Sequence, residues 1–254
     1  MIGIGTAIPF NQNVGNLVAP LNPTQMSEDC GLWYDFTDLS SLTIVSGKIQ
    51  IVTNKGSISN ADLENRTPAN QPTSTFQDGH YTARFDLNNS EQLPSINKFS
   101  LNNNGVFVIV AKLSDEGTES VYGMATMRSP NVNSMRFINN GANTTISQFT
   151  SGATATDSQA TSPLATNLNY SMYDINDTDN ELTAYYNGTA GASVTMSDSP
   201  IVTAGIFIIG SSNSSAQYFN GDIYEVFYFT DSLTDKLKGE IEAYTETKYA
   251  IPQA

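Results

Sequence analysis

The chain has 254 residues, of which 39% are hydrophobic and 10% aromatic, enough to bury roughly three quarters of its unfolded surface. Its 25 acidic and 11 basic side chains give a formal net charge of −14, which repels phosphate backbones and excludes a general nucleic-acid binder. Ser, Thr and Asn supply 80 residues, a composition typical of loop-rich β proteins, and a single cysteine excludes an intrachain disulfide or a Cys-based metal cluster.

The N-terminal segment, residues 1–27, holds three of the ten prolines and four asparagines. This composition predicts an extended arm rather than part of a core, and an arm of this kind is ordered only when another structure holds it. The first residues lack the basic flank and sustained apolar run of a signal peptide, and no stretch reaches the ~18 apolar residues that cross a bilayer. We therefore expect no secretion signal and no membrane insertion.

From residue 32 onward, short apolar segments are separated by clusters of Asn, Gly, Asp, Ser and Pro, which suit turns. Eleven strands are predicted, at residues 32–36, 48–53, 82–86, 106–113, 121–127, 134–138, 145–149, 168–173, 181–187, 206–209 and 222–230. Eleven to thirteen strands in about 220 residues predict a two-sheet antiparallel sandwich. The segments 106–111 and 206–209 are apolar on both faces, so both should be central strands.

In the last twenty residues, the spacing of apolar side chains changes from that of strands to that of a helix. Leu233, Leu237, Ile241 and Tyr244 recur at helical spacing, and Thr234 before an acidic residue is typical of a helix N-cap. One amphipathic helix over residues 233–249 is predicted. With no internal repeat and no linker, the chain divides into an arm, residues 1–27, and one domain, residues 28–254.

Several motifs resemble one family. Phe219–Phe229 (FNGDIYEVFYF) and the helix after it resemble the closing strand and helix of laminin-G-like, concanavalin A-like lectin/glucanase jelly rolls. Gly31–Asp35 (GLWYD) resembles the family's first strand, and Tyr185–Gly188 (YYNG) its central hairpin. The resemblance covers residues 31–250 and implies an all-β jelly roll of two curved sheets. Because this family includes glycan-binding domains, glycosidases and structural appendages, the fold alone does not select a function.

A second resemblance concerns the whole chain. The arm, the missing secretion signal and the Lys-poor, Asn/Thr/Ser-rich composition are similar to those of bacteriophage virion proteins that carry such a domain. This resemblance implies a structural protein of a head, tail or fibre, made in the host cytoplasm and located in the virion. It also implies that residues 1–27 attach the domain to other virion structural proteins, and that the chain forms a homo-oligomer.

Carboxylates are the first chemical candidates. Related hydrolases place them as Glu-x-Asp-x-Glu along one strand, and this chain has no such triplet. Asp222 and Glu225 are three residues apart, which predicts opposite faces of a strand, with Glu225 on the face of Ile223, Phe227 and Phe229. We interpret Glu225 as a hydrogen-bonded core carboxylate rather than a catalytic group, and we predict no catalytic residues and no enzymatic activity.

Three other reactive side chains have structural interpretations. His80, the only histidine, falls in a turn before a strand and is expected in an exposed polar loop. Cys30 is expected to be a small packed residue rather than a nucleophile. Trp33 could stack on a sugar, but in a first strand it is expected in the core.

The densest acidic cluster lies in a turn between two predicted strands. Asp174, Asp177 and Asp179 supply hard oxygen ligands of the kind that Ca²⁺ prefers, although the EF-hand spacing fails. A solvated hairpin turn is the favoured interpretation, and these three residues are the calcium candidates. No other cofactor is predicted.

The sequence therefore favours a non-enzymatic virion structural protein that displays a lectin-like jelly roll and binds host cell-surface glycans. The alternatives are a stand-alone glycan-binding lectin module and, more remotely, a diverged glycan hydrolase.

Overall fold

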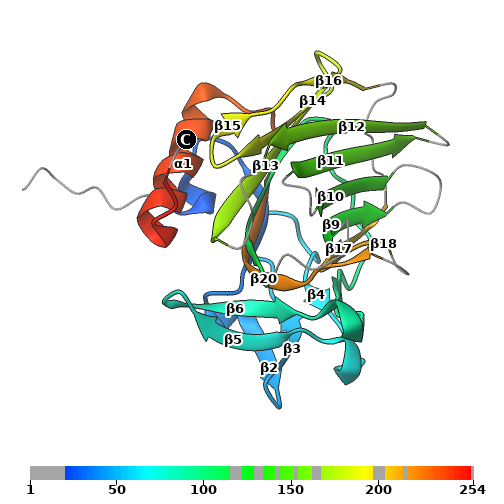
Figure 1. Ribbon diagram of the computed structural model, residues 1–254, viewed down its shortest axis with the longest axis vertical. Coiled ribbons are helices and arrows are strands. Elements are labelled where there is room, and N and C mark those ends of the chain that lie inside the picture. The colour runs from blue at the N-terminus through cyan, green and yellow to red at the C-terminus, as the bar shows by residue number, and fades with distance from the viewer. Residues whose placement is uncertain are drawn as a thin grey trace, which may run out of the picture.

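The computed structural model describes residues 21–114, 122–128, 134–140, 144–151, 154–161, 167–196, 204–213 and 217–252. Two antiparallel sheets pack face to face, and one C-terminal helix covers the outer face of the larger sheet (Figure 1). The predicted all-β jelly-roll sandwich with a C-terminal helix is thus confirmed. No helix of the described chain is long and apolar enough to cross a membrane. Residues 1–20, most of the predicted arm, lie outside the described residues.

The larger sheet, sheet A, has the strand order β15-β14-β13-β8-β20-β6-β5-β3-β2; outside this order, β1 pairs with β20, β4 with β3 and β16 with β14. Its strands are β1 (Cys30–Asp35), β2 (Leu42–Val45), β3 (Lys48–Val52), β4 (Leu63–Glu64), β5 (Thr73–Gln77), β6 (His80–Phe85), β8 (Gly105–Leu113), β13 (Asn169–Asn176), β14 (Glu181–Tyr186), β15 (Thr189–Ala190), β16 (Val194–Thr195) and β20 (Gly221–Phe229).

The smaller sheet, sheet B, has the order β12-β11-β10-β9-β17-β7. Its strands are β7 (Leu93–Pro94), β9 (Tyr122–Arg128), β10 (Ser134–Asn140), β11 (Thr144–Ser151), β12 (Thr154–Thr161) and β17 (Ile206–Ile209). A separate ribbon joins β18 (Ser211–Asn213) to β19 (Gln217–Tyr218), and four short 3-10 helices occupy Pro23–Gln25, Leu39–Ser41, Pro68–Asn70 and Leu87–Asn89.

Every predicted strand segment overlaps an observed strand. The apolar strand β8 is buried on both faces between β13 and β20, and β17 pairs with both β9 and β7, so each has neighbours on both sides as predicted. One face of β8 meets the core between the sheets, where Phe107 packs against Phe137 and Phe207 at ring-centroid distances of 4.6 and 5.8 Å. The other face meets the core beneath the helix, through Val106 and Val108.

Helix α1 (Asp235–Tyr249) begins directly after the predicted cap Thr234, two residues later than the predicted bound of 233. The side chain of Thr234 accepts a hydrogen bond from Leu237 N at 3.1 Å and caps the helix. Leu237 and Ile241 are fully buried against sheet A. The end of the predicted arm also packs here, because Met26 is buried in the same core and Ser27 N donates to Glu240 Oε2 at 2.7 Å.

A β-bulge at Tyr224 reorganises strand β20. The pairing with β8 skips one residue between Ile223, which lies opposite Ala111, and Glu225, which lies opposite Val110. Ile223 therefore points into the core between the sheets, whereas Tyr224 and Glu225 both reach the helix-covered face. At the same place β20 exchanges one neighbour, β6, for another, β1.

This bulge makes two sequence predictions wrong. Asp222 and Glu225 lie on the same face of β20, and Ile223 lies on the opposite face from Glu225. An inserted residue shifts the two-residue alternation by one, so side chains three apart point the same way. The prediction that Phe227 and Phe229 share the face of Glu225 is confirmed.

Candidate functional site

A buried cluster of charged side chains lies between α1 and the strands β1 and β20. Glu225 is fully buried and accepts hydrogen bonds from Trp33 Nε1 at 3.0 Å, Tyr244 Oη at 2.8 Å and Lys248 Nζ at 2.7 Å. Asp35 stands directly opposite Glu225 in the strand pairing. Lys55 Nζ lies 3.1 Å from Asp35 Oδ2, and Lys248 Nζ lies 3.5 Å from Asp35 Oδ1.

The surroundings push the pKa values of these two carboxyls apart. Burial raises the pKa of Glu225, the charge of Asp35 raises it further, and Lys248 opposes both. Burial also acts on Asp35, but Lys248, a hydrogen bond from Thr37 and Lys55 together hold the pKa of Asp35 below its usual value. Opposed pKa values of this kind occur in catalytic acid–base pairs.

The geometry indicates that Glu225 and Asp35 have a structural rather than a catalytic role. Helix α1 covers Glu225, whose oxygens already accept bonds from three side chains, and Asp35 is 4% exposed. The interpretation of Glu225 as a hydrogen-bonded core carboxylate is confirmed. Trp33, 7% exposed and bonded to Glu225, is confirmed as a core residue.

Cys30 and His80 both pack against the body of the protein. The Cys30 thiol is buried and donates to Leu32 O at 3.2 Å, and burial raises its pKa far above the range of a nucleophile, which confirms its packing role. The expectation of an exposed loop for His80 is wrong. His80 begins β6, is half-buried, and its ring centroid lies 5.0 Å from that of Tyr249, because the β5–β6 hairpin folds over the end of α1.

The predicted calcium candidates have local partners instead. Asp174 accepts a hydrogen bond from Leu233 N at 3.0 Å at the entry to α1, and burial raises its pKa to about 6. Asp177 accepts from Asn103, and Asp179 accepts from Asn176 within the β13–β14 turn. Among the described residues, no three His, Cys, Asp or Glu side chains are grouped so as to hold a metal ion.

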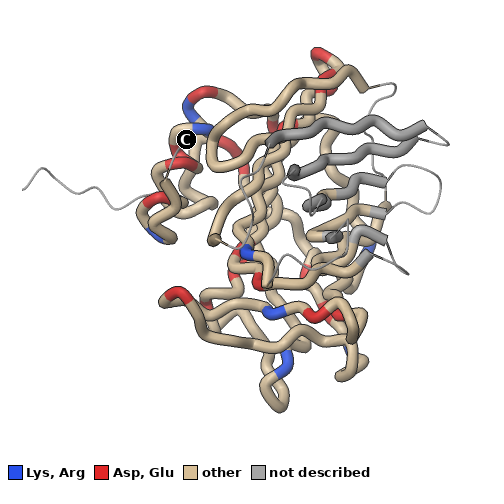
Figure 2. Tube along the Cα trace, in the orientation of Figure 1, with Lys and Arg blue, Asp and Glu red and all other residues tan. Residues whose placement is uncertain are grey.

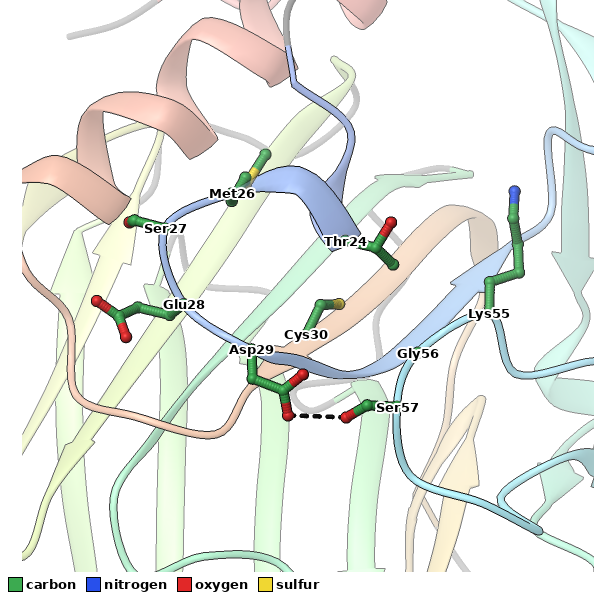
Figure 3. A pocket seen from close by; sticks show the side chains of 9 residues that line it. All are labelled: Thr24, Met26, Ser27, Glu28, Asp29, Cys30, Lys55, Gly56 and Ser57. Carbon is green, nitrogen blue, oxygen red and sulfur yellow. Dashed lines mark hydrogen bonds between the residues drawn. The ribbon is translucent and has the colours of Figure 1, made fainter.

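A pocket of about 410 Å³ opens between residues 24–30 and the loop 55–57 (Figure 3). Asp29 Oδ2 accepts a hydrogen bond from Ser57 Oγ at 2.7 Å, and Met26 points toward α1. The lining cation, Lys55, is paired with Asp35 and Asp38 and lies 3.9 Å from the centroid of the Trp33 ring. Of the polar groups that line the pocket, Asp29 and Ser57 are therefore bonded to each other and Lys55 is paired with carboxylates outside it, whereas Ser27 Oγ is buried without a partner.

An exposed aromatic pair lies on the β5–β6 hairpin. Phe76 is 64% exposed and Tyr81 38% exposed, and the two residues are cross-strand partners whose ring centroids lie 5.1 Å apart at an interplanar angle of 69°. Rings this exposed stand out because most of the other aromatic rings whose burial the structure describes lie in the two cores.

The opposite face of this hairpin is anchored by polar contacts. Thr82 Oγ1 donates to Asp222 Oδ1 at 3.0 Å, and at the hairpin tip Asp78 Oδ2 accepts from Tyr224 Oη at 2.7 Å and from Lys112 Nζ at 2.8 Å. The anchored hairpin thus holds the aromatic pair in place on the face of sheet A opposite α1, the face on which Ala83 and Phe85 of the same strand enter the core between the sheets.

Sequence reasoning missed this pair. Phe76 and Tyr81 flank Gln77-Asp78-Gly79-His80, and Asp-Gly is a strong signal for a two-residue hairpin turn. That turn fixes residues 76 and 81 as cross-strand partners, so the pairing, though not the exposure, could have been predicted. Figure 2 shows basic residues scattered singly over the described trace, without a stripe that would suit a phosphate backbone.

Comparison with known proteins identifies the family. The family model described as the concanavalin A-like lectin/glucanases superfamily matches residues 96–236, more than half of the chain. The chain therefore belongs to this family, as the sequence motifs indicated. No curated protein matches the sequence.

Similar solved structures share little sequence identity with the chain, and one of them, an arabinanase domain, supports the fold. Domain 4 of AbnA, a GH43 extracellular arabinanase from Geobacillus stearothermophilus solved in complex with arabinotriose, has a TM-score of 0.56 and 14% identity, covering 85% of this chain and 98% of that domain. CBM40 of the Ruminococcus gnavus IT-sialidase, bound to α2,3-sialyllactose, has a TM-score of 0.45 and 14% identity over 55% of this chain and 83% of that one. A heptameric SAP-like pentraxin from Limulus polyphemus has a TM-score of 0.47 and 9% identity, covering 64% of this chain and 78% of that one.

Proposed function

We propose that this protein is a non-enzymatic carbohydrate-binding jelly roll, and that Phe76 and Tyr81 form the platform on which a sugar ring stacks. The exposed aromatic pair is the observation that carries the proposal. A pyranose or furanose ring presents an apolar C–H face, and an exposed aromatic ring buries that face without needing a deep pocket.

The neighbourhood of the pair suits a sugar. Ser74 lies two residues before Phe76, so its side chain shares the face of β5 that carries Phe76, and it is only partly buried. A hydroxyl beside an aromatic platform supplies the hydrogen bonding that orients a saccharide. The similar solved arabinanase domain, which is in complex with arabinotriose, supports a carbohydrate as the class of ligand.

The burial and lysine pairing of two acidic residues support binding without hydrolysis. Glycoside hydrolysis needs two carboxyl groups that reach the scissile bond from either side. Asp35 and Glu225, which face each other across adjacent strands, are both buried and paired with lysines. A diverged hydrolase, the remote alternative, would need other acids.

We further propose that the domain is displayed on a bacteriophage particle and binds host-surface glycans. Residues 1–27 would attach it to other virion proteins, and many identical copies would convert weak sugar contacts into avidity. Sequence composition and the arm support this location. A stand-alone lectin module, the alternative, would bind the same ligands without a particle.

Affinity electrophoresis in gels that contain single soluble polysaccharides, arabinan among them, tests the carbohydrate site. The full chain should be retarded by at least one polysaccharide, and Phe76→Ala/Tyr81→Ala should migrate as in a gel without polysaccharide. Ile96→Ala, which removes another exposed apolar side chain, is the matched control and should be retarded like the wild type. Equal retardation of the double variant and the wild type would place the site elsewhere, and release of reducing sugar on prolonged incubation would refute the non-enzymatic assignment.

A further inference from the structure

The strands that end the two sheets differ in how their free edges are covered. At one end of sheet A, β15 is two residues long; in sheet B, β7 is also two residues long and contains Pro94, while β12 lies against β14 and β16. Short strands, proline and covering elements are the usual protections of a sheet edge. The remaining end, β2, is four residues long and contains no proline, and no other strand of the described residues pairs with its free edge.

Strand β2 presents an apolar edge. It consists of Leu42-Thr43-Ile44-Val45, pairs with β3 on one side, and ends the sheet on the other. Ile44 is 37% exposed and Val45 52% exposed, and the strand carries no charge. Its one protective feature is a register shift between Thr43 and Ile44, which twists the edge locally. A row of unpaired backbone groups with β-branched side chains is a template for another strand.

The N-terminal segment has the pattern of such a strand. In the sequence of residues 2–10, Ile2-Gly3-Ile4-Gly5-Thr6-Ala7-Ile8-Pro9-Phe10, bulky residues occupy every even position and Gly, Ala or Pro every odd one. This alternation presents one bulky face and one smooth face when the backbone is extended. The glycines can follow an edge twisted by a bulge, because they adopt a wider range of backbone angles.

We propose that residues 2–10 of one copy of this protein add as a strand to the β2 edge of a neighbouring copy. Main-chain hydrogen bonds would supply the affinity, and the even-numbered side chains would pack beside Val45 on one face of the sheet, because Ile44 and Val45 are consecutive and point to opposite faces. The same exchange repeated around a ring, or reciprocally in a pair, would build a closed assembly. This assembly does not depend on the carbohydrate site.

Charge and chain path favour a neighbouring copy as the donor. Residues 1–20 carry no Asp, Glu, Lys or Arg, so the segment approaches a molecule of net charge −14 without repulsion. Met26 is buried in the core beneath α1 and Ser27 N donates to Glu240 of that helix, so the described chain starts at the helix-covered face. Three strands, β6, β5 and β3, separate β20 beneath that helix from β2. A segment from its own chain would have to pass all three.

Sedimentation velocity of the full chain over a hundredfold range of concentration tests the proposal. The wild type should associate, whereas Val45→Lys, which damages the edge, and Ile4→Asp/Ile8→Asp, which damages the donated segment, should each associate at least tenfold more weakly. An equimolar mixture of the two variants should form a complex again, because one keeps an intact edge and the other an intact segment. Ile96→Lys, a charge placed on another exposed apolar residue, should associate like the wild type.

Circular dichroism establishes that each variant is folded, and Thr43→Lys replaces Val45→Lys if the latter is not. A wild type that stays monomeric, variants that associate normally, or a mixture that does not recombine would each overturn the proposal. Hydrogen exchange tests whether the molecule's own N-terminal segment, rather than that of a neighbouring copy, occupies the β2 edge. Protected amides at residues 43–45 in a monomeric wild type, lost in Ile4→Asp/Ile8→Asp, would assign the edge to the molecule's own segment and refute donation by a neighbour.

Discussion

The ammonium of Lys248, in the last turn of helix α1, lies 2.7 Å from Glu225 Oε1 in the middle of strand β20. The same ammonium lies 3.5 Å from Asp35 on β1, so one lysine joins the helix to two neighbouring strands. Without this cation, two opposed carboxylates would face each other in a buried site. The contact fixes the C-terminal end of α1 over sheet A.

Removal of this lysine should therefore be costly. Lys248→Met should lower the free energy of unfolding by about 3 kcal/mol, because it leaves Glu225 buried without a cation. Adding Glu225→Gln should recover about half of that loss. Urea denaturation of the two variants measures both values. Lys236→Met, which removes the exposed pair with Glu240 at 3.9 Å, is the control and should change stability by less than about 0.5 kcal/mol.

Asp174 should make stability depend on pH. Its folded-state pKa, raised by burial to about 6, exceeds the usual value of 3.8, so the folded protein holds this proton more tightly than the unfolded chain does. Its contribution is therefore most favourable below pH 4 and is lost as pH rises through about 6. Asp174→Asn should remove that slope and stabilise the protein at pH 7, since an amide oxygen still accepts the bond from Leu233 N. Urea midpoints between pH 4 and 7.5 measure the slope, and an unchanged slope in the variant would contradict this account.

The Cys30 thiol should be inert in the folded protein. Burial raises its pKa and excludes reagents, so 5,5′-dithiobis-(2-nitrobenzoic acid) at pH 8 should react at a rate set by unfolding. In urea above the unfolding midpoint the same thiol should react within seconds. Rapid stoichiometric labelling of the native protein would show that the segment around Cys30 opens.

Two glycines of different surroundings provide a matched test of packing. A Cβ at Gly105 in β8 would clash with the Tyr228 ring, so Gly105→Ala should destabilise the protein by about 2 kcal/mol or more. A Cβ at Gly239, inside α1, meets nothing within 4 Å, so Gly239→Ala should stabilise it by roughly 0.5–1 kcal/mol through helix propensity. In thermal unfolding, the midpoint of Gly105→Ala should be lower than that of the wild type and the midpoint of Gly239→Ala should be higher.

Much of the fold was predictable from apolar patterning. Strand β8, strand β20 and the helix with its Thr234 cap follow from residue spacing, because each buries a continuous apolar face. Strand β12, Thr154–Thr161 (TATDSQAT), was missed because it has no large apolar side chain to mark its alternation. Its pairing with β11 depends on main-chain hydrogen bonds, which the sequence does not display.

The candidate site was less predictable than the core. The bulge at Tyr224 depends on β20 leaving β6 for β1, a long-range event with no local signal in the sequence. His80 looked like a loop residue because its partner, Tyr249, is far away in sequence. The exposure of Phe76 and Tyr81 likewise depends on which elements fail to cover their hairpin.

The most direct test of the central claim is a glycan array probed with the full chain clustered on beads, so that weak contacts add. The account predicts binding to at least one class of saccharide, loss of that signal in Phe76→Ala/Tyr81→Ala, and retention in Ile96→Ala. Absence of any signal from the clustered wild type, or an undiminished signal from the double variant, would contradict the assignment of a carbohydrate site to this aromatic pair.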